Sequence, residues 1–342
     1  MKRLLALILA VALAISTVGC GGGTSSTASG GDASGTSASG QAQGLKVGIA
    51  FAGWNTNQNW LQLRELLHET YDPLGYTFYE VDLTSAEDVP VAAENFISAG
   101  CDIVLLHGHY KEAAAAVLPL FKEAGIAVGM VDNDFKDYDG MTYCVRCDDV
   151  ETGTFMGQEV AKWVNENIEG EAIVGILGYE AMEAFGSRAW AIKDAMEANM
   201  DNGRVVIVGD ASVGDSQMAS AENMLSAYPD MNVMVTIAGS MSIACYEAGK
   251  AAGWDERPKN SCGVFGWDAT DDELNIILED NCFKASLDLD LQHQYMILME
   301  KLIEYVENGN QYPEGVTEDD VQWDYPMKLV YIDEAEEYLG SL

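Results

Sequence analysis

Short apolar runs alternate with longer segments of helical pattern along the chain from Leu45 onward. Most of each run is apolar at consecutive positions, which predicts strands that are buried on both faces. Strands of this kind form parallel sheets that are covered by helices. The expected strands cover residues 46–51, 77–81, 103–106, 127–131, 173–177, 205–208, 233–237 and 263–267.

The spacing of these strands divides them into two groups of four. Successive strands begin about 24 to 32 residues apart, but the interval between the strands at 127–131 and 173–177 is nearly twice as long. We therefore predict an α/β protein with two doubly wound parallel-sheet lobes. In open parallel sheets a ligand lies beyond the carboxyl ends of the strands. The residues directly after each strand are the candidate site.

Aromatic and polar residues are concentrated at these positions. Aromatic rings offer apolar faces for stacking, and carboxylates and amides direct hydrogen bonds. This combination is typical of sites that hold polyhydroxylated or heterocyclic solutes. The candidates are Trp54, Asn57, Asn59 and Trp60 after the first strand, His107 after the third, Asp132 and Asn133 after the fourth, and Trp267 with Asp268 at the end of the last.

The N-terminus has the pattern of a bacterial export signal. Lys2 and Arg3 precede an apolar stretch at residues 4–18 that is too short to span a membrane. The stretch ends at Cys20 in Thr-Val-Gly-Cys, which resembles a lipobox, although Thr17 stands where leucine is usual. We expect residues 1–20 to be a lipoprotein signal peptide, with lipid attached to Cys20.

The next segment, residues 21–44, consists mainly of Gly, Ser, Ala and Thr. Such a sequence cannot bury enough apolar surface to fold, so we expect a disordered tether. The protein is therefore expected to be extracytoplasmic and lipid-anchored to the cell membrane, with the membrane contacted through the lipid.

Charge excludes one class of partner. The chain of 342 residues carries 18 Lys and Arg against 55 Asp and Glu, a net charge of −37. No cationic surface is available to neutralise a phosphate backbone, so nucleic acid is not an expected partner. The 48% of apolar residues is sufficient for a sizeable core.

Six stretches carry a family resemblance: 100–105, 124–128, Cys147-Asp148-Asp149 followed by Gly153 and Gly157, 228–230, 263–268 and 325–330. In their order and spacing they resemble the type I periplasmic-binding-protein superfamily, and specifically the ribose-binding-like substrate-binding proteins of sugar ABC importers. The resemblance covers the segment from Lys46 to about Leu339. It implies two discontinuous lobes joined by three hinge strands. Lobe 1 is expected at 45–146 plus 292–322, and lobe 2 at 147–291 plus 323–342.

The resemblance also assigns roles to individual residues. Asp132 falls on the aspartate that accepts sugar hydroxyls, and Arg188 falls near an arginine that begins the first helix of the second lobe. Asp288 and Asp290 lie near a hinge position where a ligand-binding glutamine is common. Asn133 replaces an arginine of the family pattern, which leaves the identity of the sugar open.

The function implied by the resemblance is capture of a small molecule, a sugar first of all, for an ABC permease and its ATPase. A purine nucleoside or an autoinducer-like compound is the alternative ligand. A secreted carbohydrate-acting enzyme is a further alternative, because Asp132 and Asp268 resemble a glycosidase carboxylate pair. The chain has no nucleophile motif, P-loop or Gly-x-Gly-x-x-Gly, so we expect no enzymatic activity and no cofactor. We also expect no metal site, although Cys144 and Cys147 have the spacing of a zinc half-site.

Overall fold

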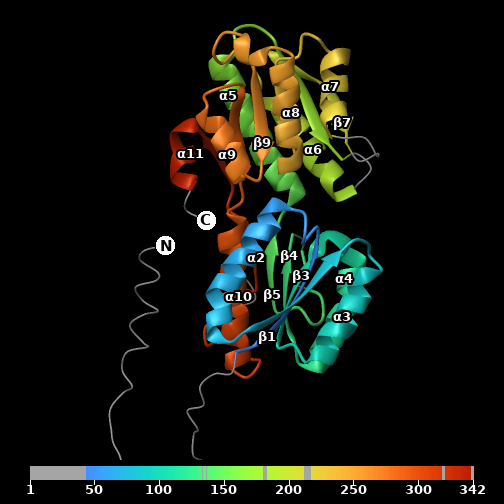
Figure 1. Cartoon of the computed structure of the whole chain (residues 1–342). Helices are drawn as coiled ribbons and strands as arrows, with labels where there is room; N and C mark the ends of the chain where they lie inside the picture. The colour runs from blue at the N-terminus through green and yellow to red at the C-terminus, as the bar shows by residue number, and fades with distance from the viewer. Residues whose placement is uncertain are drawn as a thin grey trace, which may run out of the picture. The chain divides into compact units, whose positions relative to one another are not determined.

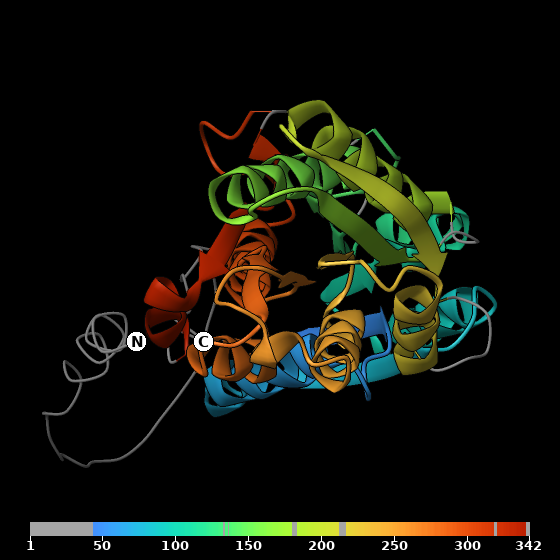
Figure 2. The ribbon, with the colours of Figure 1, turned by 90° about the horizontal axis from the view of Figure 1, so that it is seen from above.

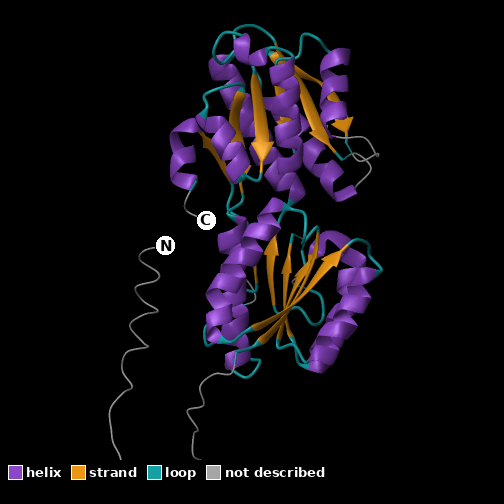
Figure 3. Cartoon of the chain, viewed as in Figure 1, coloured by secondary structure: helices purple, strands orange, loops and turns teal. Residues whose placement is uncertain are grey.

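A computed structural model describes residues 44–132, 134–135, 137–179, 183–211, 217–317 and 320–339. Within these residues the strands form two sheets of six, each flanked by helices (Figures 1 and 3). This arrangement confirms the α/β class and the two doubly wound sheets. The eight strands expected from the apolar runs are all present.

The first sheet has the order β11-β5-β4-β3-β1-β2, and its paired strands are parallel. Its central strands β3 and β4 are buried at every position, as the unbroken apolar runs predict. The strands are β1 (Lys46–Ala52), β2 (Thr77–Leu83), β3 (Ile103–His107), β4 (Ala127–Val131), β5 (Tyr143–Arg146) and β11 (Gln322–Asp324).

The helices that accompany this sheet include α10, which comes from far along the chain and packs against β3, β4 and β5 beside α2. Figure 1 shows α2 and α10 next to one another. Asn57 caps the start of α2 by accepting a hydrogen bond from the backbone N–H of Asn59 at 2.9 Å. The helices are α2 (Gln58–Tyr71), α3 (Asp88–Ala99), α4 (Lys111–Ala124) and α10 (Leu291–Glu307).

The second sheet has the order β12-β10-β9-β8-β6-β7 and is parallel except for β12, which runs antiparallel to β10. Its fully buried strands are β8 and β9. The strands are β6 (Ala172–Gly178), β7 (Gly203–Asp210), β8 (Val233–Thr236), β9 (Gly263–Trp267), β10 (Phe283–Asp288) and β12 (Lys328–Tyr331).

Two of its helices, α5 and α6, pack unusually closely. A Cβ atom on Gly153 would lie 2.4 Å from the carbonyl oxygen of Arg188, and one on Gly157 would lie 2.5 Å from that of Ile192. The close approach therefore requires glycine and fixes the backbone of Arg188. Figure 2 shows the ribbon from a second direction. The helices of this half are α5 (Asp149–Asn167), α6 (Glu183–Asn199), α7 (Gln217–Ala227), α8 (Gly239–Ala251), α9 (Asp271–Leu278) and α11 (Ile332–Tyr338).

The chain passes between the two sheets three times, from β5 to α5, from β10 to α10 and from β11 to β12. Arg146 at the end of β5 donates through Nη2 to Oδ2 of Asp324 at 2.7 Å, which ties the first crossing to the third. The expected boundary between residues 322 and 323 falls inside β11, whose pairing with β5 continues through Asp324. The division of the chain into lobes otherwise remains a prediction.

No helix among the residues described above combines the length and the apolarity that a membrane span requires. The expected signal peptide, Cys20 and nearly all of the tether lie outside the described residues, as does Asn133.

Candidate functional site

A cavity of about 890 Å³ is lined by residues that follow strands of both sheets. The positions after the strands therefore do converge, as the topology of parallel sheets requires. The predicted site residues that line the cavity are Asn57, Asn59, Trp60, His107, Asp132, Arg188, Trp267 and Asp268. Their part in binding a ligand stays a prediction.

Asp132 is the centre of a hydrogen-bonded chain at the end of β4. Its Oδ2 lies 2.6 Å from Nε2 of His107, and its Oδ1 accepts a hydrogen bond from the hydroxyl of Tyr325 at 2.9 Å. The hydroxyl of Tyr295 lies a further 3.0 Å from that of Tyr325. Asp132 has a backbone φ of 73°, a left-handed conformation that Asp and Asn tolerate better than most residues.

The hydrogen bonds of His107 define its tautomer. Its Nδ1 accepts the backbone N–H of Ala52 at 3.3 Å, so the ring proton is on Nε2 and is donated to Asp132. Burial acts to raise the pKa of Asp132, but His107, the Tyr325 hydroxyl and the charge of Arg188 outweigh it and hold that pKa below its ordinary value. Asp132 is therefore a fixed, ionised acceptor in the cavity.

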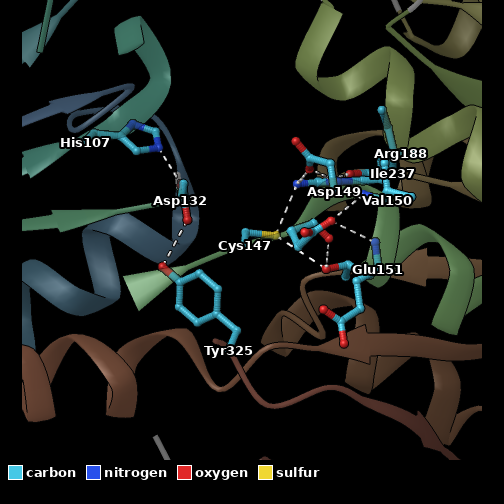
Figure 4. A network of polar contacts seen from close by, with 11 residues as sticks. His107, Asp132, Cys147, Asp149, Val150, Glu151, Arg188, Ile237 and Tyr325 are labelled. Carbon is cyan, nitrogen blue, oxygen red and sulfur yellow. Dashed lines mark hydrogen bonds and ion pairs between the residues drawn. The ribbon is translucent and has the colours of Figure 1, made fainter. Parts of the chain in front are cut away.

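Arg188 is held from several directions on the opposite wall. Its Nε donates to Oδ1 of Asp149 at 2.8 Å, and its Nη1 donates to the carbonyl oxygen of Ile237 at 2.9 Å. Its Nη2 lies 3.6 Å from Sγ of Cys147 (Figure 4). The guanidinium also lies over the ring of Trp267, 4.4 Å from the centroid. Arg188 is thus oriented by the protein before any ligand arrives.

The two tryptophans of the cavity wall are almost completely buried. Trp267 is 1% exposed and has Arg188 over one face, and Trp60 is 5% exposed. The Nε1 of Trp60 donates to the carbonyl oxygen of Ala52 at 3.1 Å, and its ring makes edge contacts with Phe51 and His107. Both rings therefore offer limited area to a ligand, at one edge or one face.

Asp268 lies on the wall formed by the second sheet. Its Oδ2 accepts the backbone N–H of Gly239 at 3.0 Å, so it caps α8, a helix whose own N-cap residue Ala238 has no side-chain acceptor. Its backbone φ is 90°. Burial raises the pKa of Asp268, and the charge of Asp132 raises it further against the opposing effects of Gly239 and Arg188.

Three predicted residues do not line the cavity. Trp54 is buried in the core behind it, where its backbone N–H donates to Asp82. Asp288 and Asp290 lie in the crossing from β10 to α10, where Oδ1 of Asp288 accepts the N–H of Asp290 at 2.7 Å. Burial raises the pKa of Asp288 to about 6. These two residues therefore belong to the segment that crosses between the sheets, and they are not among the residues that line the cavity.

The sequence reasoning missed three lining residues and one residue that holds Asp132. Asp149 and Cys147 follow β5, a strand of four residues that the apolar pattern did not identify. Tyr179 directly follows β6 and was not among the predicted residues. Tyr325 holds Asp132 from the third crossing and was noted only as part of a family stretch. A search after every strand, short ones included, would have found the first three.

Within the described ranges, no group of three or more His, Cys, Asp or Glu side chains is arranged to hold a metal ion. Cys144 and Cys147 are buried, and burial raises the pKa of Cys147 to about 11 and that of Cys144 to about 12. These thiols therefore remain protonated near neutral pH.

Two flanked parallel sheets, three crossings and a cavity beyond the strand ends define the type I periplasmic-binding fold. Residues 49–309 match the family model described as a periplasmic binding protein domain, and the chain belongs to this family. A Rhizobium meliloti protein assigned to rhizopine binding is 28% identical over 187 residues, which cover 53% of this chain and 58% of that relative. The chain thus matches little more than half of the length of this curated relative.

Solved structures share the fold. An ABC transporter solute-binding protein from Bacillus halodurans, with bound myo-inositol, is 23% identical with a TM-score of 0.71, over 90% of this chain and all of that one. A periplasmic solute-binding protein from Actinobacillus succinogenes with bound D-allose is 16% identical, also with a TM-score of 0.71, over 86% of this chain and all of that one. A Caulobacter myo-inositol-binding protein is 18% identical with a TM-score of 0.68, over 87% of this chain and 97% of that one.

Proposed function

We propose that this protein is an extracytoplasmic receptor that captures a sugar or a related polyol and delivers it to an ABC import permease and its ATPase. The observation that carries the proposal is the cavity of about 890 Å³, in which ionised Asp132 from one sheet and the fixed Arg188 from the other face the same space. Membership of a binding-protein family favours this function over the glycosidase alternative. The names of the structural relatives, which hold myo-inositol and D-allose, support a polyol as the ligand class.

The polar groups of the cavity suit hydroxyl groups in both of their roles. Asp132 keeps further lone pairs on both oxygens and can accept from a ligand hydroxyl, and Asn57 and Asn59 can both accept and donate. Arg188 can donate to a ring or hydroxyl oxygen. The edges of Trp60 and Trp267 can contact the apolar C–H face of a sugar ring. A ligand would therefore be held by directed hydrogen bonds between apolar walls.

Bending at the three crossings would allow the two sheets to move closer together when a ligand is bound. A ligand that touches residues of both sheets binds better to the arrangement in which they are close, and so shifts the population toward it. The chain can bend in a few residues at the crossings, including the segment from Asp288 to Leu291. We infer that the permease recognises this closed arrangement. The lipid anchor at Cys20 would keep the receptor at the membrane.

The test is a thermal-shift screen of the purified protein against myo-inositol, D-allose, other monosaccharides and purine nucleosides. A ligand at about 100 times its dissociation constant should stabilise the fold by about 2.7 kcal/mol. Stabilisation by a polyol supports the proposal. Stabilisation by nucleosides alone would show that the ligand is a nucleoside and not a sugar or polyol. Turnover of glycosides by the purified protein would contradict the receptor function.

A further inference from the structure

The charged groups deep in the cavity do not balance. Among the lining residues that the structure describes, one guanidinium faces three carboxylates, since Arg188 lies opposite Asp132, Asp149 and Asp268. Arg188 is paired with Asp149, because its Nη2 lies 2.6 Å from Oδ1 of that residue. Asp132 and Asp268 then represent a surplus of two carboxylates.

The remaining titratable groups of the lining do not remove this surplus. Lys111 and Glu112 both belong to the first turn of α4 at the more exposed side, where their charges offset one another. His107 is a neutral donor to Asp132, as its contact with Ala52 requires. Burial lowers the pKa of His109, so this ring is neutral near pH 7 as well.

The two surplus carboxylates accept hydrogen bonds from uncharged donors. Asp132 accepts from His107 and Tyr325, and Asp268 accepts from the backbone N–H of Gly239. The charge of Asp132 also raises the pKa of Asp268, so it makes this second carboxylate costlier to ionise. A neutral ligand that excludes water from this space would strengthen the repulsion between them, because the local dielectric constant would fall.

We propose that the ligand is a polyol or sugar that carries one protonated amine, and that its ammonium group lies between Asp132 and Asp268. This inference rests on the proposed function and specifies the ligand class of the same cavity. An ammonium group has three N–H donors, so one such group placed between the two carboxylates would donate to both. Hydrogen bonds between ionised partners are about twice as strong as neutral ones, so the amine distinguishes this ligand from its neutral analogue.

The dependence of affinity on pH distinguishes the two kinds of ligand. Arg188 of α6 and Asp132 after β4 act on the pKa of Asp268, and Asp268 in turn raises the pKa of Glu273 of α9, Asp288 of β10 and Tyr295 of α10. An ammonium ligand favours ionised Asp268, so its affinity rises as pH rises through the pKa of this group. For a neutral ligand, desolvation of the same carboxylate opposes the hydrogen bonds from the ligand hydroxyls, so its affinity depends less on pH over that range.

The experiment is calorimetry of the purified protein with matched pairs of compounds between about pH 4.5 and pH 7. The pairs are inositol with a monoamino-inositol, D-glucose with D-glucosamine, and D-galactose with D-galactosamine. In at least one pair the amino compound should bind about tenfold or more tightly, with affinity that increases with pH. In the variant Asp268→Asn the ratio of the two affinities should fall by about tenfold. The control Asp272→Asn changes an exposed residue of the neighbouring helix and should leave the ratio unchanged.

The possible failures are distinguishable. Neutral compounds that bind as tightly as their amino partners, or more tightly, would overturn the inference and leave the proposed function standing. An unchanged ratio in folded Asp268→Asn protein would also overturn it, because the amine would then lie elsewhere. If no compound of either series binds, the inference and the proposed sugar or polyol receptor fail together.

Discussion

Asp132 is the residue on which the site depends most directly, because it is ionised, fixed by two donors and open to the cavity. We predict that Asp132→Asn weakens binding of the ligand by about tenfold or more, the value of a lost hydrogen bond to a charged acceptor. Asparagine tolerates the positive φ of this position, so the backbone should be retained. Calorimetry on the folded variant measures the effect. Trp163→Phe, a change at a core residue outside the cavity lining, should leave the affinity unchanged.

Arg188 contributes to stability as well as to the site. Replacing it by Met leaves the carboxylate of Asp149 and the carbonyl of Ile237 without their donor in a buried place. The free energy of unfolding should fall by about 3 kcal/mol, as for other broken buried ion pairs. Urea denaturation measures the loss. Arg204→Met removes an ion pair with Glu171 that is largely exposed, and this control should cost less than about 1 kcal/mol. Equal losses in the two variants would show that Arg188 is not held as described.

At the residue scale, three predicted site residues were chosen because they stand at or directly after apolar strands. These residues, His107, Asp132 and Asp268, lie at the ends of β3, β4 and β9 and line the cavity, and their part in binding a ligand stays a prediction. Asp149 and Tyr325 were missed, because their places are set by short segments at the crossings. The burial of the tryptophans could not be predicted either, since it depends on Arg188 and Tyr295 from distant elements.

At the scale of elements, a local apolar run decided which strands were predictable. The eight predicted strands contain such runs. The strand β10 has six residues, but Lys284 and Ser286 interrupt its apolar positions, whereas β5, β11 and β12 are three or four residues long and include charged residues. These short strands exist because neighbours from remote parts of the chain supply hydrogen-bond partners. A pattern within the local sequence contains no information about such pairing.

The start of α9 provides a test at the element scale. Thr270 and Glu273 form a capping box, and the Oε1 atom of Glu273 is buried with no hydrogen-bond partner among the described residues. Burial, together with the charge of Asp268, raises the pKa of Glu273 to about 8. The folded state therefore binds this proton more strongly than the unfolded state does.

The sign of the pH effect follows directly. The stability contributed by protonated Glu273 is fully present below the unfolded pKa and is lost as pH rises toward about 8. We predict that the free energy of unfolding of the wild type declines relative to Glu273→Gln between about pH 5 and pH 8, by at most about 1.4 kcal/mol per pH unit. Urea titrations across this range measure it. The exposed Glu279 of the same segment supplies the control, Glu279→Gln. If the free energy of unfolding depended on pH in the same way in the wild type and in Glu273→Gln, the raised pKa of Glu273 would be contradicted.

At the scale of the whole molecule, the two sheets share one cavity, and three crossings connect them. Direct contacts also join elements of the two halves, such as the 3.2 Å hydrogen bond from Gln62 of α2 to Asp271 of α9. A ligand in the cavity would add further contacts of this kind and favour the closed arrangement. The central claim is therefore that one small solute touches residues of both sheets at once.

The most direct test of this claim is a crystal structure of the protein with the solute that stabilises it most in the thermal-shift screen. We expect the solute in the cavity, within hydrogen-bonding distance of Asp132 on one side and of Arg188 or Asp268 on the other. A solute bound outside the cavity, or one that contacts residues of a single sheet only, would contradict the account.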